Sequence, residues 1–502
     1  HQLCAVKIPL DRKSRKPIYL QIKDKISRLI KSGVLQPEER LPSIRSLAEN
    51  LQVNKLTILE AYSILEADGI IMARQGSGYF VNKSNINLTS SNNMKSTFAP
   101  AQNVIISESV GNSFFDIHMS AVQAQINEKM INFSYGLPRP PQDMALIGRR
   151  TITNSIDNLF AYDVPHGQAT LRRQVAQLLV QQGLEITAEN LIITSGCQQA
   201  ISLTMQYYLQ KDDWVIVESP TYHGAISILE NIGARIIGIP MNAEGMNLEL
   251  LEKYLKSHRP KLIYTISTQH NPTGIATSQS HRKQLLELAE KYQCPILEDN
   301  AYEGLNFEPV PPPIKALDKQ DLVIYAGTFS KTLIPGLRVG YMVVTGKHYQ
   351  PLVERKLMDD VHTSTISQAI VSEYLGSGHY RRHRKKLQTE NLLSRNLMLQ
   401  AMETYFPQEA KWTVPKGGLF LWVQLPDNID ISEIRQQAIK ETVLFASGSA
   451  FFPDKQGYPA MRLSFSNTSE SEIDLGISIL GKILKTCIYT GCDNYSYQEI
   501  LI

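Results

Sequence analysis

The chain has 502 residues, of which 43% are hydrophobic and 20% are charged, and its formal net charge is +3. This length exceeds one ordinary core, so we expect at least two domains, and the composition is that of a globular protein rather than a disordered one. The sequence has no apolar run long enough to cross a bilayer, so we expect no membrane-spanning segment.

The charge is unevenly distributed along the chain. Residues 1–82 hold 13 of the 51 Lys and Arg but only 8 of the 48 Asp and Glu, which leaves 38 and 40 for the remainder. A basic segment attached to a nearly neutral body is typical of a nucleic-acid reader joined to a second domain. By itself this signal is weak, because small basic segments are common.

Three helices are predicted near the N-terminus. An apolar stripe that begins after Pro17 and stops near Gly33 predicts the first, and its members are Ile18, Ile22, Ile26, Leu29 and Ile30. Ser43 is a suitable N-cap for a short second helix that ends near Asn50. The third runs from about Asn54 to Ala67, and it offers four apolar residues for its buried side, Leu56, Leu59, Ile64 and Leu65.

The second and third helices are joined only by Leu51–Val53, which predicts a helix-turn-helix whose second helix can lie in the DNA major groove. Two β-prone stretches follow, Ile70–Ala73 and Gly78–Val81, on either side of Arg-Gln-Gly-Ser at 74–77. They predict a hairpin wing whose glycines allow close approach to a phosphate backbone.

The segment from Pro17 to Val81 resembles the winged helix-turn-helix of the GntR family, through RLPSIRSLAENL, TILEAYSILEADGII and QGSGYFV. The resemblance implies a domain over residues 8–82 that binds double-stranded DNA. It implies DNA contacts by six residues, Arg40, Arg45, Asn54, Lys55, Thr57 and Gly76. Lys55 stands where the family usually has Arg, and it lacks the fork that reads guanine. The alternative is a small helical domain whose basic residues only face solvent.

The rest of the chain divides by composition. Residues 83–103 are rich in Asn and Ser and poor in large apolar residues, which predicts a flexible linker. Over residues 104–485, strand-like apolar runs alternate with helical segments, the pattern of an α/β domain with a mostly parallel sheet. Residues 486–502 lose this periodicity, and we expect a loosely held tail there.

Four segments of the α/β domain follow predicted strands and carry reactive or polar residues. They are SGCQQA after Leu191–Thr194, STQHNPTG after Leu262–Ile266, EDNAY after Cys294–Leu297, and GTFSKT with PGLRVGY after Leu322–Tyr325. Singly, each has an ordinary explanation: a plain βα turn, a turn-starting Asn-Pro, a helix-capping carboxylate or a surface lysine. At the carboxyl ends of parallel strands, however, such residues face the crevice where these sheets bind ligands.

Together SGCQQA, HNPTG, EDNAY and FSKTLIPGLRVGY resemble the fold-type I aminotransferases that depend on pyridoxal phosphate, over about Ile131 to Lys485. The resemblance implies a large α/β domain, a smaller C-terminal α+β subdomain and pyridoxal phosphate as cofactor. Lys331 would form the Schiff base with the cofactor aldehyde. Asp299 would pair with the pyridinium nitrogen, and Tyr222 would stack on the ring.

The same resemblance implies further binding residues. Asn271 and Tyr302 would hydrogen-bond the phenolic oxygen of the ring, and Arg462 would hold the α-carboxylate of a substrate or effector. Tyr162, in YDVPHGQATLR, would reach the cofactor of a partner subunit. The phosphate would be held by Gly196, Cys197, Gln198, Ser330 and Arg338.

Several conspicuous residues receive no functional role. His166, His223 and His270 lack an evident acid–base partner, and Arg381–Lys386 is expected to be a solvated helix face rather than a second nucleic-acid contact. Cys197 is expected to fill space in the phosphate turn. The five cysteines form neither a paired framework nor a metal-ligand cluster, so we expect no metal and a cytoplasmic, reducing compartment.

A GntR-type reader joined to an aminotransferase-like body is the plan of the MocR-type regulators. This resemblance implies a homodimer that binds operator DNA and senses pyridoxal phosphate, an amino compound or their adduct by shifting between dimer arrangements. The alternative is an active aminotransferase that carries a DNA-binding domain, and slow transamination is compatible with either function. An inert body is disfavoured, because it has no need of Lys331, Asp299 and Arg338 together.

Overall fold

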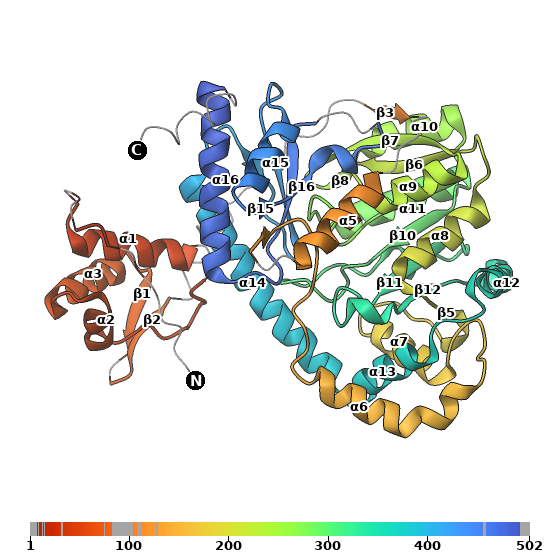
Figure 1. The fold of residues 1–502 in the computed structure, drawn as a ribbon, viewed down its shortest axis with the longest axis horizontal. Helices are drawn as coiled ribbons and strands as arrows, with labels where there is room; N and C mark the ends of the chain where they lie inside the picture. The colour runs from red at the N-terminus through yellow and green to blue at the C-terminus, as the bar shows by residue number, and fades with distance from the viewer. Residues whose placement is uncertain are drawn as a thin grey trace. The chain divides into compact units, whose positions relative to one another are not determined.

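The structure is a computed structural model, and it describes residues 8, 10–12, 14, 16–31, 34–74, 76–82, 104–107, 113–126, 129–454 and 458–491. The chain divides into two compact units (Figure 1). One comprises residues 1–95 with 396–403, and the other comprises 96–395 with 404–502. The linker expected over 83–103 lies outside the described residues.

The N-terminal unit contains the predicted helix-turn-helix and wing. Its elements are α1 (Ile18–Lys31), α2 (Ile44–Leu51), α3 (Lys55–Ala67), β1 (Ile71–Arg74) and β2 (Gly78–Val81). Ser43 caps α2 as expected, because its side chain accepts a hydrogen bond from the Ser46 N–H. β1 and β2 pair antiparallel, and Leu41 donates its N–H to the Tyr79 carbonyl at 2.9 Å, which ties the segment before α2 to the wing.

The core of this unit corrects one expectation about α3. Ile58, Ala61, Tyr62 and Leu65 are the buried residues of this helix, while Leu56 and Leu59, expected on the buried side, are 69% and 40% exposed. Helix α3 has apolar residues on more than one face, so periodicity alone does not select the buried one. Packing against α1 and α2 selects the face that holds Tyr62, whose hydroxyl donates to the Pro42 carbonyl.

The second unit is built on a nine-stranded sheet. The main strand order is β3 (Ile105–Ser107), β7 (Arg235–Asn242), β6 (Trp214–Ser219), β9 (Leu262–Thr265), β10 (Ile296–Asp299), β11 (Val323–Thr328), β12 (Gly340–Val343) and β5 (Leu191–Thr194). β8 (Gly245–Met246) pairs with β7 off this path. The five neighbouring strands β7, β6, β9, β10 and β11 run parallel to one another. β12 is antiparallel to both of its neighbours, and β3 is antiparallel to β7.

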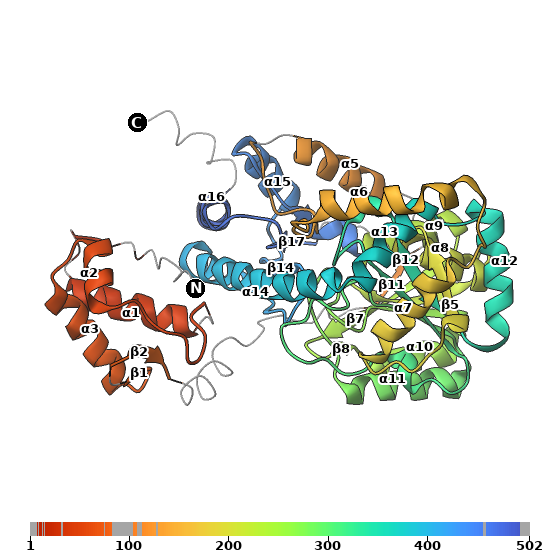
Figure 2. The ribbon, with the colours of Figure 1, turned by 90° about the horizontal axis from the view of Figure 1, so that it is seen from below.

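Helices cover both faces of this sheet (Figures 1 and 2). Val215 and Val217 of β6 pack in a core with α8 (Gly196–Tyr208), α9 (His223–Ile232) and α12 (Tyr349–Asp360). Ile216, between them, packs on the opposite face with α10 (Leu248–His258) and α11 (Gln279–Tyr292). Burial on both faces explains why the strands are continuous apolar runs rather than alternating ones.

A smaller sheet forms the C-terminal α+β part of this unit. Its strand order is β13 (Lys411–Trp412), β14 (Phe420–Gln424), β17 (Ala460–Ser464) and β16 (Ala446–Ser447). The remaining α-helices and strands are α5 (Ser113–Ile126), β4 (Ile131–Asn132), α6 (Met144–Ser155), α7 (Ala169–Val180), α13 (Thr365–Gly376), α14 (His379–Tyr405, of which 396–403 group with the first unit), α15 (Ile431–Lys440), β15 (Val443–Leu444) and α16 (Glu470–Thr490).

The C-terminal end differs from expectation in two respects. α16 continues to Thr490, so the first residues of the expected tail are helical, and residues 492–502 lie outside the described part. Cys487 is disulfide-bonded, although none of the cysteines was expected to pair, whereas Cys197 and Cys294 are free. Among the described helices, none is both long and apolar enough to span a membrane.

Candidate functional site

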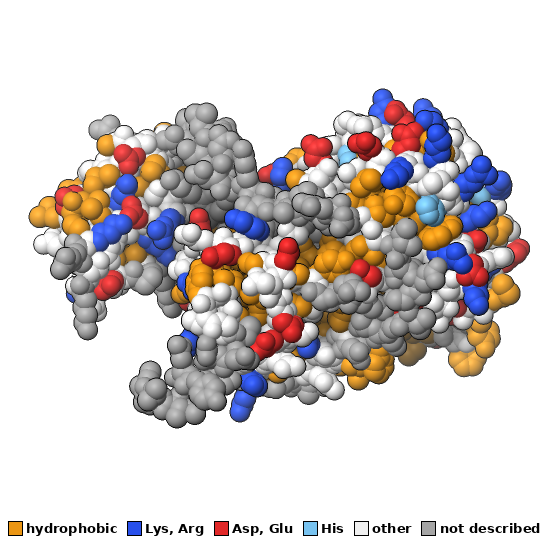
Figure 3. Space-filling model, turned by 90° about the horizontal axis from the view of Figure 1, so that it is seen from above, with side chains coloured by type: hydrophobic (Ala, Val, Ile, Leu, Met, Phe, Trp, Pro, Cys, Tyr) orange, Lys and Arg blue, Asp and Glu red, His pale blue; other side chains and the backbone are white. Residues whose placement is uncertain are grey.

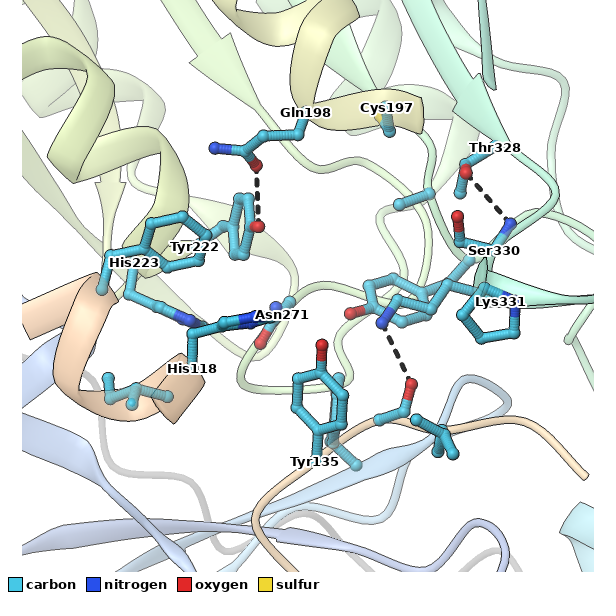
Figure 4. Close-up of a pocket in the computed structure, with 18 of the residues that line it drawn as sticks. His118, Tyr135, Cys197, Gln198, Tyr222, His223, Asn271, Thr328, Ser330 and Lys331 are labelled. Carbon is cyan, nitrogen blue, oxygen red and sulfur yellow. Dashed lines mark hydrogen bonds between the residues drawn. The ribbon is translucent and has the colours of Figure 1, made fainter. Parts of the chain in front are cut away.

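A cavity of about 420 Å³ lies at the carboxyl ends of the parallel strands (Figure 4). Asp299 ends β10, while Asn271 and Lys331 follow β9 and β11. Segments far apart in the sequence therefore converge because their strands are neighbours in the sheet. Ten of the predicted cofactor and ligand residues line the cavity: Cys197, Gln198, Tyr222, Asn271, Asp299, Tyr302, Ser330, Lys331, Arg338 and Arg462.

Lys331 provides the half-buried amine of this cavity. Its Nζ donates a hydrogen bond to the Gly136 carbonyl at 3.0 Å, and it lies 5.7 Å from the ring centroid of Tyr135. Burial, reinforced by the positive charges of Arg462 and Arg338, lowers the pKa of Lys331 to about 8. An amine with this pKa is partly uncharged near neutral pH, as a nucleophile toward a carbonyl must be.

Asp299 provides the buried carboxylate. Its Oδ2 accepts a hydrogen bond from the Tyr264 hydroxyl at 2.5 Å, and its Oδ1 accepts one from the Ala301 N–H at 3.0 Å. Burial raises the pKa of Asp299, while these hydrogen bonds act in the opposite direction. The Cys197 thiol lies 3.6 Å from Oδ1, and burial holds its pKa well above the ordinary value. Cys197 is therefore a protonated thiol, as its expected role as a filler requires.

The first turn of α8 forms an anion cradle with Arg338. Gly196 has φ +79°, and a Cβ built on it would stand 2.9 Å from Arg338 Cζ and closer still to Nη2. Arg338 Nη1 donates to Ser330 Oγ at 3.1 Å. The side chain of Ser195 makes no capping bond to the helix, and it donates to Asp360 instead. Backbone N–H groups at a helix start and an arginine fork are suitable ligands for a phosphate.

Tyr222 and Gln198 form one wall of the cavity. The Tyr222 hydroxyl donates to Gln198 Oε1 at 2.8 Å (Figure 4). A Cβ on Gly224 would stand 2.7 Å from Tyr222 Cε1, so the glycine leaves room for the ring. Burial raises the pKa of Tyr222, which keeps its hydroxyl protonated. The Tyr222 ring is thus held in place by the hydrogen bond of its hydroxyl to Gln198 and by its packing against Gly224.

Arg462 on β17 is 2% exposed and brings a positive charge into the cavity. Its Nη1 donates to Asn271 Oδ1 at 2.8 Å, and its Nη2 donates to the Ser134 carbonyl at 2.7 Å. Its Nε has no hydrogen-bond partner among the described residues. Burial lowers the pKa of Arg462 to about 10, so it remains charged at neutral pH. A buried cation without a carboxylate partner is an incomplete site that an anionic ligand would complete.

The predicted DNA-contact residues lie on the surface of the N-terminal unit. Asn54 is the N-cap of α3, and its Oδ1 accepts from the Leu56 N–H at 3.0 Å. Lys55 is exposed at the helix start and Thr57 is half-buried. Arg45 forms an exposed ion pair with Glu49 at 3.1 Å. On the wing, Gly76 has φ +74°, and the Arg40 side chain lies against Gly78.

Family comparisons agree with both units. Residues 128–480 match the family model of aminotransferase class I and II, and residues 18–81 match that of the bacterial regulatory proteins of the gntR family. The chain belongs to the MocR-type regulators. In this architecture a GntR DNA-binding domain is fused to a fold-type I aminotransferase domain, as predicted from the sequence.

Relatives match this MocR-type chain over nearly its whole length. YdfD of Bacillus subtilis, named as an uncharacterized HTH-type transcriptional regulator, is 30% identical over 482 residues, 95% of this chain and 98% of that protein. YisV of the same organism, also named an HTH-type transcriptional regulator, is 31% identical over 93% of this chain and 96% of its own. Kynurenine aminotransferase of Pyrococcus horikoshii, solved with PMP, is 33% identical with a TM-score of 0.69, over 75% of this chain and 95% of that structure.

One wall of the cavity was missed at the sequence level. Helix α5 contributes Phe114, Ile117, His118, Val122 and Gln125 to the lining. His223, given no role from the sequence, lines the cavity too. It is 6% exposed, its Nδ1 has no partner among the described residues, and burial lowers its pKa well below the ordinary value. The sequence of α5, SFFDIHMSAVQAQI, is largely apolar, but this does not indicate what the helix packs against.

Tyr162 does not line the cavity of its own chain. It is 90% exposed, and its ring lies 6.1 Å from that of His362. Nearby in the sequence, Phe160 is 97% exposed, Ile156 is 61% exposed and Leu146 is 66% exposed. Several large apolar side chains close together in the sequence rarely remain this exposed unless another protein surface covers them.

Proposed function

We propose that this MocR-type protein is a transcription regulator that binds operator DNA through its N-terminal unit. In this proposal it acts in the cytoplasm and senses pyridoxal phosphate, an amino compound or their adduct in the aminotransferase-like cavity. The observation that carries the proposal is the partly uncharged Lys331 in one cavity with Asp299, in a chain that also has a winged helix-turn-helix. The names of YdfD and YisV support a regulatory role.

The residues of the cavity fit pyridoxal phosphate. The cradle of Gly196 and Arg338 would hold the phosphate, Tyr222 would contact the ring face, and Asp299 would hold a proton on the ring nitrogen. When bound, the cofactor supplies an aldehyde and an electron-withdrawing ring. Lys331 would provide the amine that attaches to it.

The sensed ligand is an amino compound with a carboxylate. Arg462, with its unpartnered Nε, would receive that carboxylate. The wall from α5 carries no Lys, Arg, Asp or Glu among its lining residues, so it favours an uncharged ligand side chain. Binding changes transcription only if the ligand prefers one dimer arrangement over another.

The regulator is a homodimer in this proposal. A second copy would cover the exposed apolar residues Leu146, Ile156 and Phe160, and it would bring Tyr162 to the partner's cavity. Two-fold symmetry would also present two DNA readers to two half-sites of an operator.

A working aminotransferase is the second candidate, and a specific observation favours keeping it. The cavity holds the three groups that are needed to bind and convert an amino acid, which are Lys331, Asp299 and Arg462. Turnover of an amino acid with a keto acid at ordinary enzyme rates, about 1–1,000 per second, would favour this candidate over the sensor.

Two measurements on the full-length protein test the proposal. Added pyridoxal phosphate should give the absorbance band of the lysine-bound cofactor, and Lys331→Ala should abolish it. DNA upstream of its own or a neighbouring gene should bind with an affinity that falls steeply with salt. A spectrum unchanged in Lys331→Ala would refute the cofactor assignment. DNA binding that survives deletion of residues 1–82 would show that the N-terminal unit is not the DNA-binding domain.

A further inference from the structure

The exposed face of α3 carries two leucines. Leu56 is 69% exposed and Leu59 is 40% exposed, and both lie outside the face that buries Ile58, Tyr62 and Leu65. Figure 3 shows hydrophobic side chains on the surface of the N-terminal unit, at the left end of the view where α2 and α3 lie. Neither leucine belongs to the core of the unit, so both side chains are available for contact with another molecule.

The backbone at this point is firmly held. Asn54 caps α3 through its Oδ1, which accepts the Leu56 N–H at 3.0 Å. Ile58 and Tyr62, on the opposite face, are completely buried. The Leu56 side chain is therefore presented from a fixed helix start rather than from a mobile loop.

The chemistry of this face limits what it can read. From Lys55 to Ala67 the helix contains no Arg, Asn or Gln, so Lys55 is its only side chain of the kinds that make paired hydrogen bonds to guanine or adenine. The other exposed residues of the helix are Lys55, Glu60, Ser63, Glu66 and Ala67. In the major groove, the feature that matches an apolar side chain is the C5-methyl group of thymine.

We propose that Leu56, assisted by Leu59, is a base-reading residue of this protein and recognises thymine methyl groups in the major groove. The inference rests on the proposed DNA-binding function, and it adds the class of base that is read. Lys55 is adjacent to Leu56 at the helix start, and Arg40 of the same unit lies against the wing glycine Gly78. Both supply positive charge that attracts phosphate.

A contact with another protein is the competing use of an exposed leucine. The place of Leu56 next to Lys55, at the start of the second helix of a helix-turn-helix, favours DNA, since such a helix can lie in the major groove where the thymine methyl is accessible. The test below separates the two, because a protein contact is indifferent to a methyl group on DNA.

The experiment uses full-length protein and a duplex selected by it from a random-sequence library. Each thymine of that duplex is replaced in turn by deoxyuridine, which removes only the methyl group, and affinities are measured by fluorescence anisotropy. Burying one such carbon is worth about 0.8 kcal/mol, which corresponds to a loss of about 4-fold at each contacted position. Leu56→Ala should bind the thymine duplex about as weakly as the wild-type protein binds the deoxyuridine duplex. The variant should no longer distinguish thymine from deoxyuridine at that position.

Controls separate the failures. Leu475→Ala replaces an exposed leucine of the other unit and should retain the full deoxyuridine effect. DNA binding in which no thymine position is sensitive, or sensitivity that persists in Leu56→Ala, would overturn the role of Leu56 and leave DNA binding intact. Failure of the wild-type protein to bind any duplex would instead refute the DNA-binding function, and this proposal with it.

Discussion

Arg338 lies directly over Gly196, so close that any side chain at position 196 would overlap its guanidinium. Gly196 also has φ +79°, a backbone conformation that residues with a Cβ adopt at a cost of about 1–2 kcal/mol. The glycine therefore serves two purposes at once. It lets α8 begin in this conformation, and it lets the arginine reach the first turn where a phosphate would bind.

Replacing Gly196 by alanine should weaken pyridoxal phosphate binding about 10-fold or more, because strain of about 1–2 kcal/mol adds to displacement of Arg338. Equilibrium dialysis with the full-length protein measures the effect. Gly148→Ala is the control, since a Cβ there meets nothing within 4 Å and the backbone is helical. Equal affinity in both variants would contradict the cradle.

The lowered pKa of Lys331 predicts how fast the cofactor attaches at different pH. With a pKa of about 8, roughly one-tenth of the amine is uncharged at pH 7, and the attachment rate should rise with pH and level off above pH 8. An ordinary lysine would keep gaining rate up to about pH 10. Stopped-flow absorbance across pH 6–10 distinguishes the two. A midpoint near 10 would show that burial does not depress this pKa.

Asp299→Asn should retain the shape of the site but remove its negative charge. A charge-assisted hydrogen bond contributes about 1.5–3 kcal/mol, so cofactor affinity should fall about 10- to 100-fold. The absorbance band should shift as well, because the ring nitrogen would lose its proton. Tyr264→Phe removes only the hydrogen bond to Oδ2, and it should have a smaller effect on both readouts.

The exposed apolar surface predicts a change of assembly. Phe160→Asp would place a charge where a second copy should pack, so sedimentation velocity should show monomers at concentrations where the wild-type protein is a dimer. Leu475→Asp, at an exposed position on α16, should leave the assembly unchanged. A Phe160→Asp protein that remains dimeric would show that the dimer forms through another surface.

The wing predicts a salt effect on DNA binding. If Arg40 neutralises one phosphate, Arg40→Ala should weaken binding to all sequences alike and lower the slope of log affinity against log salt by about one. Binding titrations at several salt concentrations, on the selected duplex and on a scrambled one, provide the measurement. A loss confined to one sequence would mean that Arg40 reads a base instead.

The sequence by itself was sufficient to predict the two-part architecture and most of the cavity. The reader was predictable because a helix cap at Ser43, a three-residue turn and a glycine-bearing wing are local features. Lys331, Asp299 and Asn271 were predictable because each follows a strand in a parallel sheet, and the topology of such sheets brings these ends together.

Only the tertiary structure determined which face of each helix is used. Leu56 and Leu59 were expected to be buried, yet packing of α3 against α1 and α2 selects Ile58 and Tyr62 and leaves the two leucines exposed. The sequence likewise did not predict that α5 and His223 line the cavity. The physical reason is common to these cases: capping and turn formation depend on neighbours in the chain, whereas burial depends on partners that are distant in it.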